Sequence, residues 1–326
     1  MSVLGIVITY KETKLCEDAI KSLINSGVDV ALVFNGWCEE YRRWLERVEN
    51  YVDFKFLNKE NVGFCKGNNM AMRLAIKKGY DYVFLLNNDA YVEPDCIEEL
   101  VKVMKKNEKV GMVQPKVYKA WNKKILDTTG HIFKYGDKYS WERGFGGPMD
   151  RGEFEEDYEQ YDDKKNILGC CGCSALYKVE MLREIGLFWE KLWSIGEDAE
   201  LSWRAYKHGW KAMFVPEAIA YHWRGYTGRS GKNSNMNIKK VWEALFYRNW
   251  VHILRRHGNS KQIKLTSAIW FYTGCKSWVG KRIERNNIGG HFVWLAGLAL
   301  VNGKFFERME SEFMEMFKRM VGIDSI

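Results

Sequence analysis

The stretch FLLNNDAYVEP, Phe84 to Pro94, decides which fold the sequence favours. Its apolar start is typical of a buried strand, and that strand runs directly into Asn87-Asn88-Asp89. Two amides and a carboxylate have no favourable place inside an apolar core. We therefore expect this strand to end at a crevice in which a ligand is bound.

Strands and helices alternate around this stretch. The pattern predicts an α/β fold with a mostly parallel sheet flanked by helices. The expected strands are residues 3–9, 30–34, 54–57, 82–86, 110–118 and 167–177. The expected helices are residues 15–24 and 38–51, one that follows the glycine-bearing turn NVGFCKGNN and ends at Gly79, one opening at Pro94, one from about Lys178, one at 196–210 and a helical region from about 237 onward.

Composition limits the class of protein. Hydrophobic residues make up 46% of the 326 residues and aromatic residues 15%, enough for a large core. We find neither a signal peptide nor a transmembrane segment, and we expect a cytoplasmic protein with reduced thiols. Cys170, Cys171 and Cys173 lie close together in sequence, and we interpret them as small buried residues in preference to a metal site.

Polar groups follow several of the predicted parallel strands, at Thr9-Tyr10, Asn35-Gly36, 61–69 and 87–89. The carboxyl ends of such strands meet at one edge of a sheet, where ligands bind. Ordinary turn chemistry is the alternative, since Asn, Asp and Gly are common turn residues. Four such ends on successive strands favour a binding site.

The residue types at this edge suit a nucleotide-diphosphate ligand with a metal ion. Asp89 can bind a hard divalent cation, Mg²⁺ or Mn²⁺, and Asn87 and Asn88 can add neutral hydrogen bonds. Gly63 and Gly67 allow a backbone to approach a ligand closely. The stretch matches neither the dinucleotide-binding glycine pattern nor the P-loop pattern.

A second acidic site is Gly196-Glu197-Asp198, at the start of a predicted helix. The positive end of the helix dipole stabilises acidic side chains at a helix start. An N-terminal cap is therefore the alternative to a catalytic role for Glu197 and Asp198. His222 follows another short strand, and it is either a metal ligand or a structural histidine.

Six motifs in order resemble the family-2 glycosyltransferases of the GT-A type, which are inverting enzymes, especially their rhamnosyltransferase-like branch. The resemblance covers about Val3 to His257. The motifs are IVITYKE, NVGFCKGNN, FLLNNDAYVEPD, GCSALYKVEMLREIGLF, GEDAELSWRAYKHGW and VPEAIAYHWRG.

The resemblance implies roles for the candidate residues. Thr9, Tyr10, Glu12 and Asn68 would surround the nucleotide, with Asn35 at the end of the second strand and Asn87 and Asn88 beside the donor. Asp89 and His222 would hold the metal. Asp198 would be the general base, with Glu197 beside it. The sites expected here are Thr9, Tyr10, Glu12, Asn35, Gly63, Gly67, Asn68, Asn87, Asn88, Asp89, Glu197, Asp198 and His222.

The resemblance also implies a division of the chain. Residues 1–236 would form the GT-A catalytic domain, with a nucleotide-sugar half at about 1–118 and an acceptor half at about 119–236. Residues 237–326 would form a helical, basic, Trp-rich region. The distribution of charge supports this division of the chain. Residues 203–326 hold 21 basic and 8 acidic side chains, a net charge of +13, whereas the first 202 residues carry a net charge of −5.

These features predict the partners. We expect a nucleotide-sugar donor, a saccharide or lipid-linked acceptor in surface polysaccharide synthesis, and no nucleic acid. The basic region suits peripheral contact with the inner face of the cell membrane. Residues 288–306 are apolar but interrupted by glycines, so they either lie in the membrane interface or pack as a helical hairpin.

Two departures from the family pattern keep other functions open. Phe34 stands where the family has an acidic residue, and the metal motif contains one carboxylate, Asp89. The alternatives are a nucleotidyltransferase and a non-catalytic carbohydrate-binding or scaffold relative.

The acidic stretch 150–163 is expected to be a solvated loop.

Overall fold

The computed structural model describes residues 2–10, 14–133, 148–224, 236–280 and 288–321. The chain divides into two compact units. One is Met1–Ile132 with Pro148–Thr227, and the other is Phe133–Gly147 with Gly228–Ile326. The larger unit contains the sheet, and the smaller contains the four C-terminal helices.

The larger unit alternates strands and helices through its first half. In chain order its elements are β1 (Val3–Tyr10), α1 (Lys14–Asn25), β2 (Asp29–Asn35), α2 (Arg42–Val48), β3 (Phe54–Asn58), α3 (Phe64–Lys78), β4 (Tyr82–Asn87), β5 (Ala90–Val92), α4 (Cys96–Lys106), β6 (Val110–Lys119), β7 (Asn122–Thr128), β8 (His131–Phe133), β9 (Pro148–Asp150), β10 (Asn166–Ile167), β11 (Ser174–Lys178), α6 (Val179–Ile185), α7 (Glu197–Lys207) and β12 (Lys211–His222). Short 3₁₀ turns flank α2 and lie before α7.

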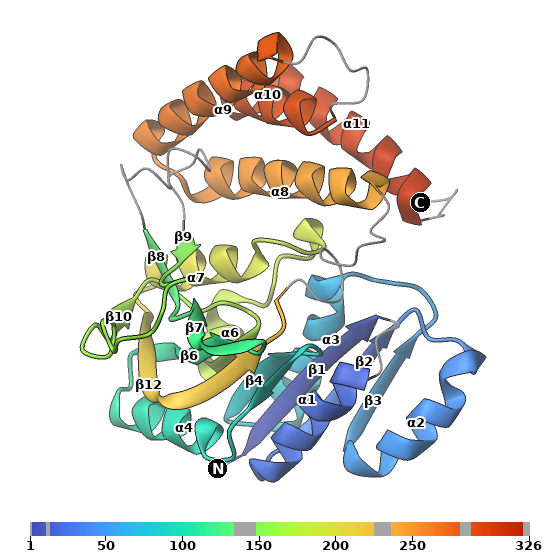
Figure 1. Ribbon diagram of the computed structural model, residues 1–326, viewed down its shortest axis with the longest axis vertical. Coiled ribbons are helices and arrows are strands. Elements are labelled where there is room, and N and C mark those ends of the chain that lie inside the picture. The colour runs from blue at the N-terminus through green and yellow to red at the C-terminus, as the bar shows by residue number, and fades with distance from the viewer. Residues whose placement is uncertain (1, 11–13, 134–147, 225–235, 281–287, 322–326) are drawn as a thin grey trace. The chain divides into compact units, whose positions relative to one another are not determined.

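The main sheet has ten strands, and its central order is β10-β12-β6-β11-β4-β1-β2-β3, with β5 beside β12 and β7 beside β6 (Figure 1). The β3-β2-β1-β4 part is parallel, and β11 runs antiparallel to both of its neighbours. β8 and β9 form a separate pair. The predicted α/β fold with a mostly parallel sheet is confirmed.

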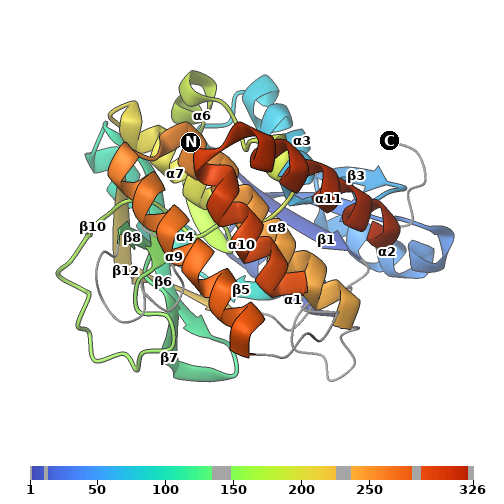
Figure 2. The ribbon, with the colours of Figure 1, turned by 90° about the horizontal axis from the view of Figure 1, so that it is seen from above.

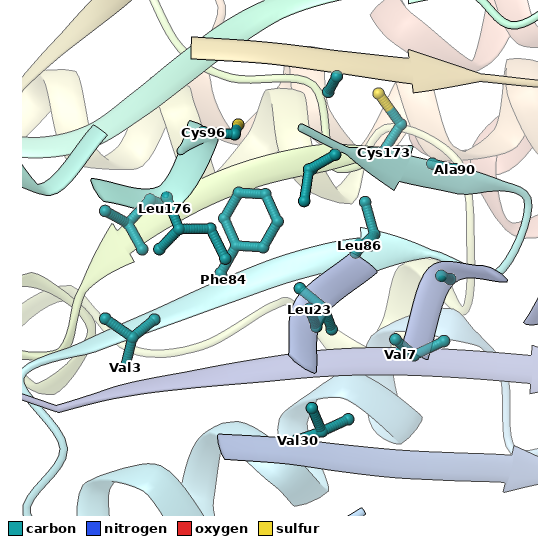
Figure 3. Packing of buried hydrophobic residues seen from close by; sticks show 14 of the residues in the cluster. Val3, Val7, Leu23, Val30, Phe84, Leu86, Ala90, Cys96, Cys173 and Leu176 are labelled. Carbon is teal, nitrogen blue, oxygen red and sulfur yellow. The ribbon is translucent and has the colours of Figure 1, made fainter. Parts of the chain in front are cut away.

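Helices cover both faces of this sheet. Apolar side chains of α1, α2 and α4 pack with alternate residues of the strands in one cluster (Figure 3). In that cluster Val7 and Phe84 point to the same side as Leu23 of α1. Ile8, the neighbour of Val7, points to the opposite face, where it meets α3 at Gly67. Side chains thus alternate between two cores, as the near-continuous apolar strands predict.

Strand register brings the polar ends together. Tyr10 at the end of β1 pairs with Asn35 at the end of β2, and Asn35 pairs with Asn58 of β3. On the other side of β1, Ile8 pairs with Asn87 of β4. The polar strand ends therefore lie at one edge of the sheet, as expected.

The predicted strand 167–177 is wrong over most of its length, because only 166–167 and 174–178 are strands. Leu168 N–H donates to the backbone carbonyl of His131 at 2.8 Å, and three of the next four amides are bonded by side chains. Cys170 N–H donates to Ser202 Oγ (3.2 Å) and Cys171 N–H to Gln114 Oε1 (2.7 Å). A Cβ on Gly169 would collide with Ser202. Small residues are needed here because α7 packs directly on this backbone.

The acidic stretch 150–163 is folded against the sheet, so the expectation of a solvated loop is wrong. Lys116 of β6 is 4% exposed and pairs with Asp157 (3.0 Å) and Asp162 (2.7 Å). Arg151 is buried and donates to Thr129 Oγ1 at 2.8 Å. Buried cations need such partners, and for Lys116 the acidic residues supply them.

The smaller unit is built from α8 (Met236–His257), α9 (Ser260–Gly280), α10 (Ile288–Val301) and α11 (Gly303–Val321). α10 lies beside α9 in both views and also contacts α8 and α11 (Figures 1 and 2). Its Leu295 and Ala296 are fully buried. The apolar segment from residue 288 thus packs within this unit as the hairpin alternative predicts. Among the described helices, none is both long and apolar enough to cross a bilayer.

Candidate active site

Side-chain hydrogen bonds connect the end of β1 to the residue after β4, and the end of β2 to the turn before α3. Asn88 Nδ2 donates to Thr9 Oγ1 at 3.1 Å, and Asn35 Nδ2 donates to the carbonyl of Gly63 at 3.2 Å. Thr9 and Asn35 are buried, whereas Tyr10 is 50% exposed. Glu12, the remaining residue predicted here, lies outside the described residues.

The glycines of NVGFCKGNN are explained by contacts within the protein. Gly63 precedes α3 with φ +85°, and an added Cβ would lie 2.6 Å from the indole of Trp193. A Cβ on Gly67 would collide with Ile8 Cδ1. Asn68 is 1% exposed, and its Nδ2 donates to the carbonyl of Phe64 at 3.0 Å. Gly63, Gly67 and Asn68 thus fix α3 behind the polar edge.

Asp89 and His222 meet at the other end of this edge. Strand β5 pairs with β12 so that Ala90 lies opposite His222, and Asp89 Oδ1 is 3.2 Å from His222 Nε2. Asn87 Nδ2 is 3.4 Å from the same ring nitrogen. Both Asp89 and His222 are about 5% exposed. The structure therefore brings together the two predicted metal ligands.

A second carboxylate, Asp127, orients the histidine from behind. Asp127 Oδ2 lies 2.8 Å from His222 Nδ1, and Asp127 also pairs with Lys119 and with Arg224. Burial alone would lower the pKa of His222, but attraction to Asp127 and Asp89 raises it to about 9. Burial opposes ionisation of Asp127, yet Arg224, His222 and Lys119 together hold its pKa well below the usual range.

The donor set fits a divalent cation. When His222 donates Nδ1–H to Asp127, its Nε2 lone pair faces the Asp89 carboxylate at 3.2 Å. Two electron-pair donors at that separation need either a proton or a cation between them. A carboxylate behind a metal-binding histidine is a common supporting arrangement. Side-chain atoms of Asp127, Cys173 and His222 also lie within 4.8 Å of one another.

Asp198 and Glu197 begin α7 in different environments. Asp198 Oδ2 accepts the Gly172 N–H at 2.9 Å, and its side chain is 18% exposed. Glu197 is 7% exposed, and its Oε2 has no hydrogen-bond partner among the described residues. Burial and the nearby Asp198 raise the pKa of Glu197 to about 8. Neighbouring carboxyl groups held in unlike environments are typical of acid–base sites.

Charged contacts connect the two acidic sites. Arg224 Nη1 donates to Asp150 Oδ2 at 2.9 Å, and Asp150 Oδ1 lies 3.7 Å from His131 Nε2. The same nitrogen lies 3.8 Å from Asp198 Oδ2. Through Asp127, Arg224 also contacts the His222 side of the network. Opposite charges therefore alternate without a break from Asp89 to Asp198.

The sequence prediction missed the middle of this network. The missed residues are Lys119, Asp127, His131, Asp150 and Arg224. One signal was present, because the stretch ILDTTGH ends an apolar run in polar residues, as FLLNND does. Asp150 gave no such signal, since its acidic surroundings are typical of a loop.

Known proteins resemble this chain over most of its length. A chondroitin synthase of Escherichia coli is 22% identical over 314 residues, 86% of this chain and 44% of the relative, so the chain spans less than half of that protein. The crystal structure of GalNAc-T7 with UDP, GalNAc and Mn²⁺ superposes with a TM-score of 0.60 at 15% identity, over 97% of this chain and 56% of the other. The structure of S. aureus TarS 1-349 gives a TM-score of 0.55 at 11% identity, over 98% and 89%.

These structural similarities identify the fold as GT-A-like. The family model named "Glycosyl transferase family 2" matches residues 6–186, more than half of the chain and all of the parallel strands that carry the polar edge. The chain belongs to glycosyl transferase family 2.

Proposed function

We propose that the protein is an inverting glycosyltransferase of the hexosyl- or rhamnosyltransferase-like type. It would transfer a sugar from a nucleotide-diphosphate sugar to a saccharide or lipid-linked acceptor in surface polysaccharide synthesis. The observation that carries this proposal is the connection of two unlike acidic sites, Asp89 with His222 and Asp198 with Glu197, within one network of the larger unit. The sugar nucleotide and saccharide chemistry of the relatives supports it.

Asp89 and His222 would hold the divalent cation, which when bound supplies Lewis-acid stabilisation of the departing diphosphate. Asp127 keeps the His222 ring turned toward Asp89 through the Nδ1 contact at 2.8 Å. Tyr10, exposed at the end of β1, would face the nucleotide, and Asn87 and Asn88 would hydrogen-bond the donor.

Asp198 would remove the proton of the acceptor hydroxyl as that oxygen attacks the anomeric carbon. Its carboxylate is partly exposed, accepts the Gly172 N–H and faces His131, and both contacts attract a negative charge. Glu197 is buried and its pKa is raised, so it is protonated at neutral pH and is a poorer base. The difference between these neighbours supports Asp198 as the base.

The experiment is a screen of UDP-, GDP- and dTDP-sugars for release of nucleoside diphosphate, with and without Mn²⁺. A glycosyltransferase releases diphosphate from at least one donor, and the release requires the cation. A non-catalytic scaffold releases none, and a nucleotidyltransferase forms pyrophosphate from a nucleoside triphosphate. NMR of the transferred sugar then tests inversion, which a retained anomeric configuration would contradict.

The exposed side of α9 supports a further proposal, contact with an anionic membrane surface. Lys261, Lys264, Leu265, Phe271 and Tyr272 are exposed and recur at helical spacing on one side of α9. Basic and aromatic side chains on one face of a helix suit an interface with anionic lipid. This face would hold the protein near a lipid-linked acceptor.

A further inference from the structure

His131 lies between two carboxylates that the sequence analysis did not connect. Its Nε2 is 3.8 Å from Asp198 Oδ2 and 3.7 Å from Asp150 Oδ1, and the residue is 5% exposed. Backbone bonds on both sides fix its position, because His131 N–H donates to Gly169 (2.7 Å) and Leu168 N–H donates to His131 (2.8 Å). The imidazole is thus held in place by the segment that also positions Gly172 beside Asp198.

Its charge follows from these neighbours. Burial would lower the pKa of His131, but the neighbouring Asp198, Cys171 and Asp150 raise it to about 9. Arg224 binds the other oxygen of Asp150 at 2.9 Å, so Asp150 is shared between two cations. Asp198 therefore faces an imidazolium at neutral pH.

The other titratable groups that act on Asp198 are neutral acids, and one of them is its chain neighbour Glu197, whose pKa is raised to about 8 by burial and by Asp198. Burial raises the pKa of Cys65 on α3, of Cys170 before β11 and of Tyr177 on β11 well above the ordinary values. Cys171, beside His131, is likewise raised, chiefly by a hydrogen bond with Cys173 and by burial. Within the described residues, His131 is the cation at ion-pair distance from Asp198.

We propose that His131 is a positioning residue for sugar transfer, whose imidazolium holds the Asp198 carboxylate from its Oδ2 side so that the carboxylate can take the acceptor proton. The inference rests on the proposed function of Asp198 as the base. His131 and the Gly172 N–H both lie at Oδ2, and Oδ1 accepts the Ala199 N–H at 2.7 Å. The acceptor oxygen forms the bond to the anomeric carbon, the diphosphate leaves with the electron pair of the broken bond, and the acceptor proton goes to Asp198. His131 is already protonated, so it takes no proton in this step.

The first test needs no substrate. The full chain is labelled with ¹⁵N-histidine, and the His131 ring signals are identified by their loss in His131→Gln. Their titration is followed in wild type and in Asp198→Asn. We expect the midpoint of His131 to fall by about 1–3 pH units in Asp198→Asn, the usual effect of removing an adjacent opposite charge. An unchanged midpoint would overturn the proposal.

The second test is the pH profile of transfer with the best donor of the UDP-, GDP- and dTDP-sugar screen. Glutamine in His131→Gln can donate a hydrogen bond but carries no charge. The pH at which the transfer rate falls to half on the acid limb of the profile should therefore be higher in His131→Gln by about 1–3 pH units. His208→Gln is the matched control, because His208 is an exposed histidine at the other end of α7. A uniform loss of rate with an unmoved acid side would show a structural role only.

The outcomes separate this inference from the proposed function. If Asp198→Asn still transfers sugar, Asp198 is not the base and the proposed function fails. If Asp198→Asn is inactive while the His131→Gln profile is unmoved, the role of His131 alone fails. If His131→Gln does not fold, the ring signals are identified by their loss in the other single-histidine variants, and the Asp198→Asn titration decides.

Discussion

Asp89 and His222, 133 positions apart in the chain, meet with 3.2 Å between Oδ1 and Nε2. The meeting follows from strand pairing, because β5 places Ala90 opposite His222 of β12. The polar end of FLLNND therefore points at a ring nitrogen whose other side is held by Asp127. Sequence position alone could not have revealed that third partner.

Replacing Asp89 by Ala is expected to abolish binding of Mn²⁺ in the presence of a nucleoside diphosphate. The reason is that it removes the carboxylate facing His222 Nε2. His222→Ala should weaken Mn²⁺ binding less, because a metal-bound imidazole is neutral and contributes less to charge balance than the Asp89 carboxylate does. Calorimetry of Mn²⁺ with UDP, GDP or dTDP measures both. The control is Asp95→Ala, an exposed residue that makes no capping hydrogen bond for α4. Equal affinity in Asp89→Ala and in the control would contradict the metal site.

Gly67→Ala is expected to destabilise the fold, although alanine favours a helix over glycine by about 1 kcal/mol. The added methyl collides with Ile8 Cδ1, and overpacking of a core costs about 1–3 kcal/mol. Ile8→Val removes that terminal methyl, so the double variant should recover much of the loss. Urea unfolding of the two single variants and the double variant measures the coupling. Additive effects would show that the contact does not explain the glycine.

The stability of the protein should depend on the charge of Glu197. Its folded pKa of about 8 lies above its ordinary value of 4.5, so the protonated form is favoured in the folded state. That contribution is complete below about pH 4.5 and is lost as the pH rises toward 8. Glu197→Gln cannot ionise, so its melting temperature should exceed that of wild type increasingly between pH 5 and 8. Glu180→Gln, at an exposed position on α6, is the control. Parallel curves for Glu197→Gln and wild type would contradict the raised pKa.

Contact of α9 with anionic membranes should depend on Lys261 and Lys264. Reversing both to Glu is expected to abolish sedimentation with vesicles of phosphatidylcholine and phosphatidylglycerol at low salt, and wild-type binding should weaken with salt. Lys105→Glu with Lys106→Glu makes the same charge change on exposed positions of α4. Arg255 is less suitable, because it donates to the carbonyl of Ala299 and lies over the Phe306 ring. If wild type does not sediment at low salt, the basic face has no such partner.

Much of the fold could be predicted because its strands are short apolar runs that end at polar residues or glycines. β1, β2, β3, β4 and β6 were located to within about two residues, and Gly79 ends α3 with φ +79° as its position implied. The segment 168–173 could not be predicted, because the amides of Cys170, Cys171 and Gly172 bond to side chains of Ser202, Gln114 and Asp198, which lie far along the chain or on another strand. Local pattern carries no information about such partners.

The candidate site divides in the same way. Asp89, Asp198 and His222 were found because each follows a recognisable strand end or helix start. Asp150 was hidden within an acidic stretch, and only the fold shows that Arg224 binds it at 2.9 Å. A single charged residue in a loop gives no sign of burial in the sequence. The network between the two acidic sites is therefore visible only in the folded structure.

The central claim is that Asp198 is the general base. Asp198→Asn keeps the size of the side chain and an oxygen that can accept the Gly172 N–H, but it cannot take a proton at neutral pH. With the base role, transfer at saturating donor should fall by about 10²–10⁴-fold while donor affinity stays nearly unchanged. Glu197→Gln should cost less, because Glu197 is buried and already protonated at neutral pH.

The decisive measurement is therefore the transfer rate of Asp198→Asn at saturating donor and Mn²⁺, with the melting temperature as the control for folding. The account predicts a folded variant that binds donor and transfers sugar at least about a hundredfold more slowly than wild type. A folded variant that transfers at a near wild-type rate would contradict it, because Asp198 would then serve only to begin α7, where Asn substitutes for Asp at little cost.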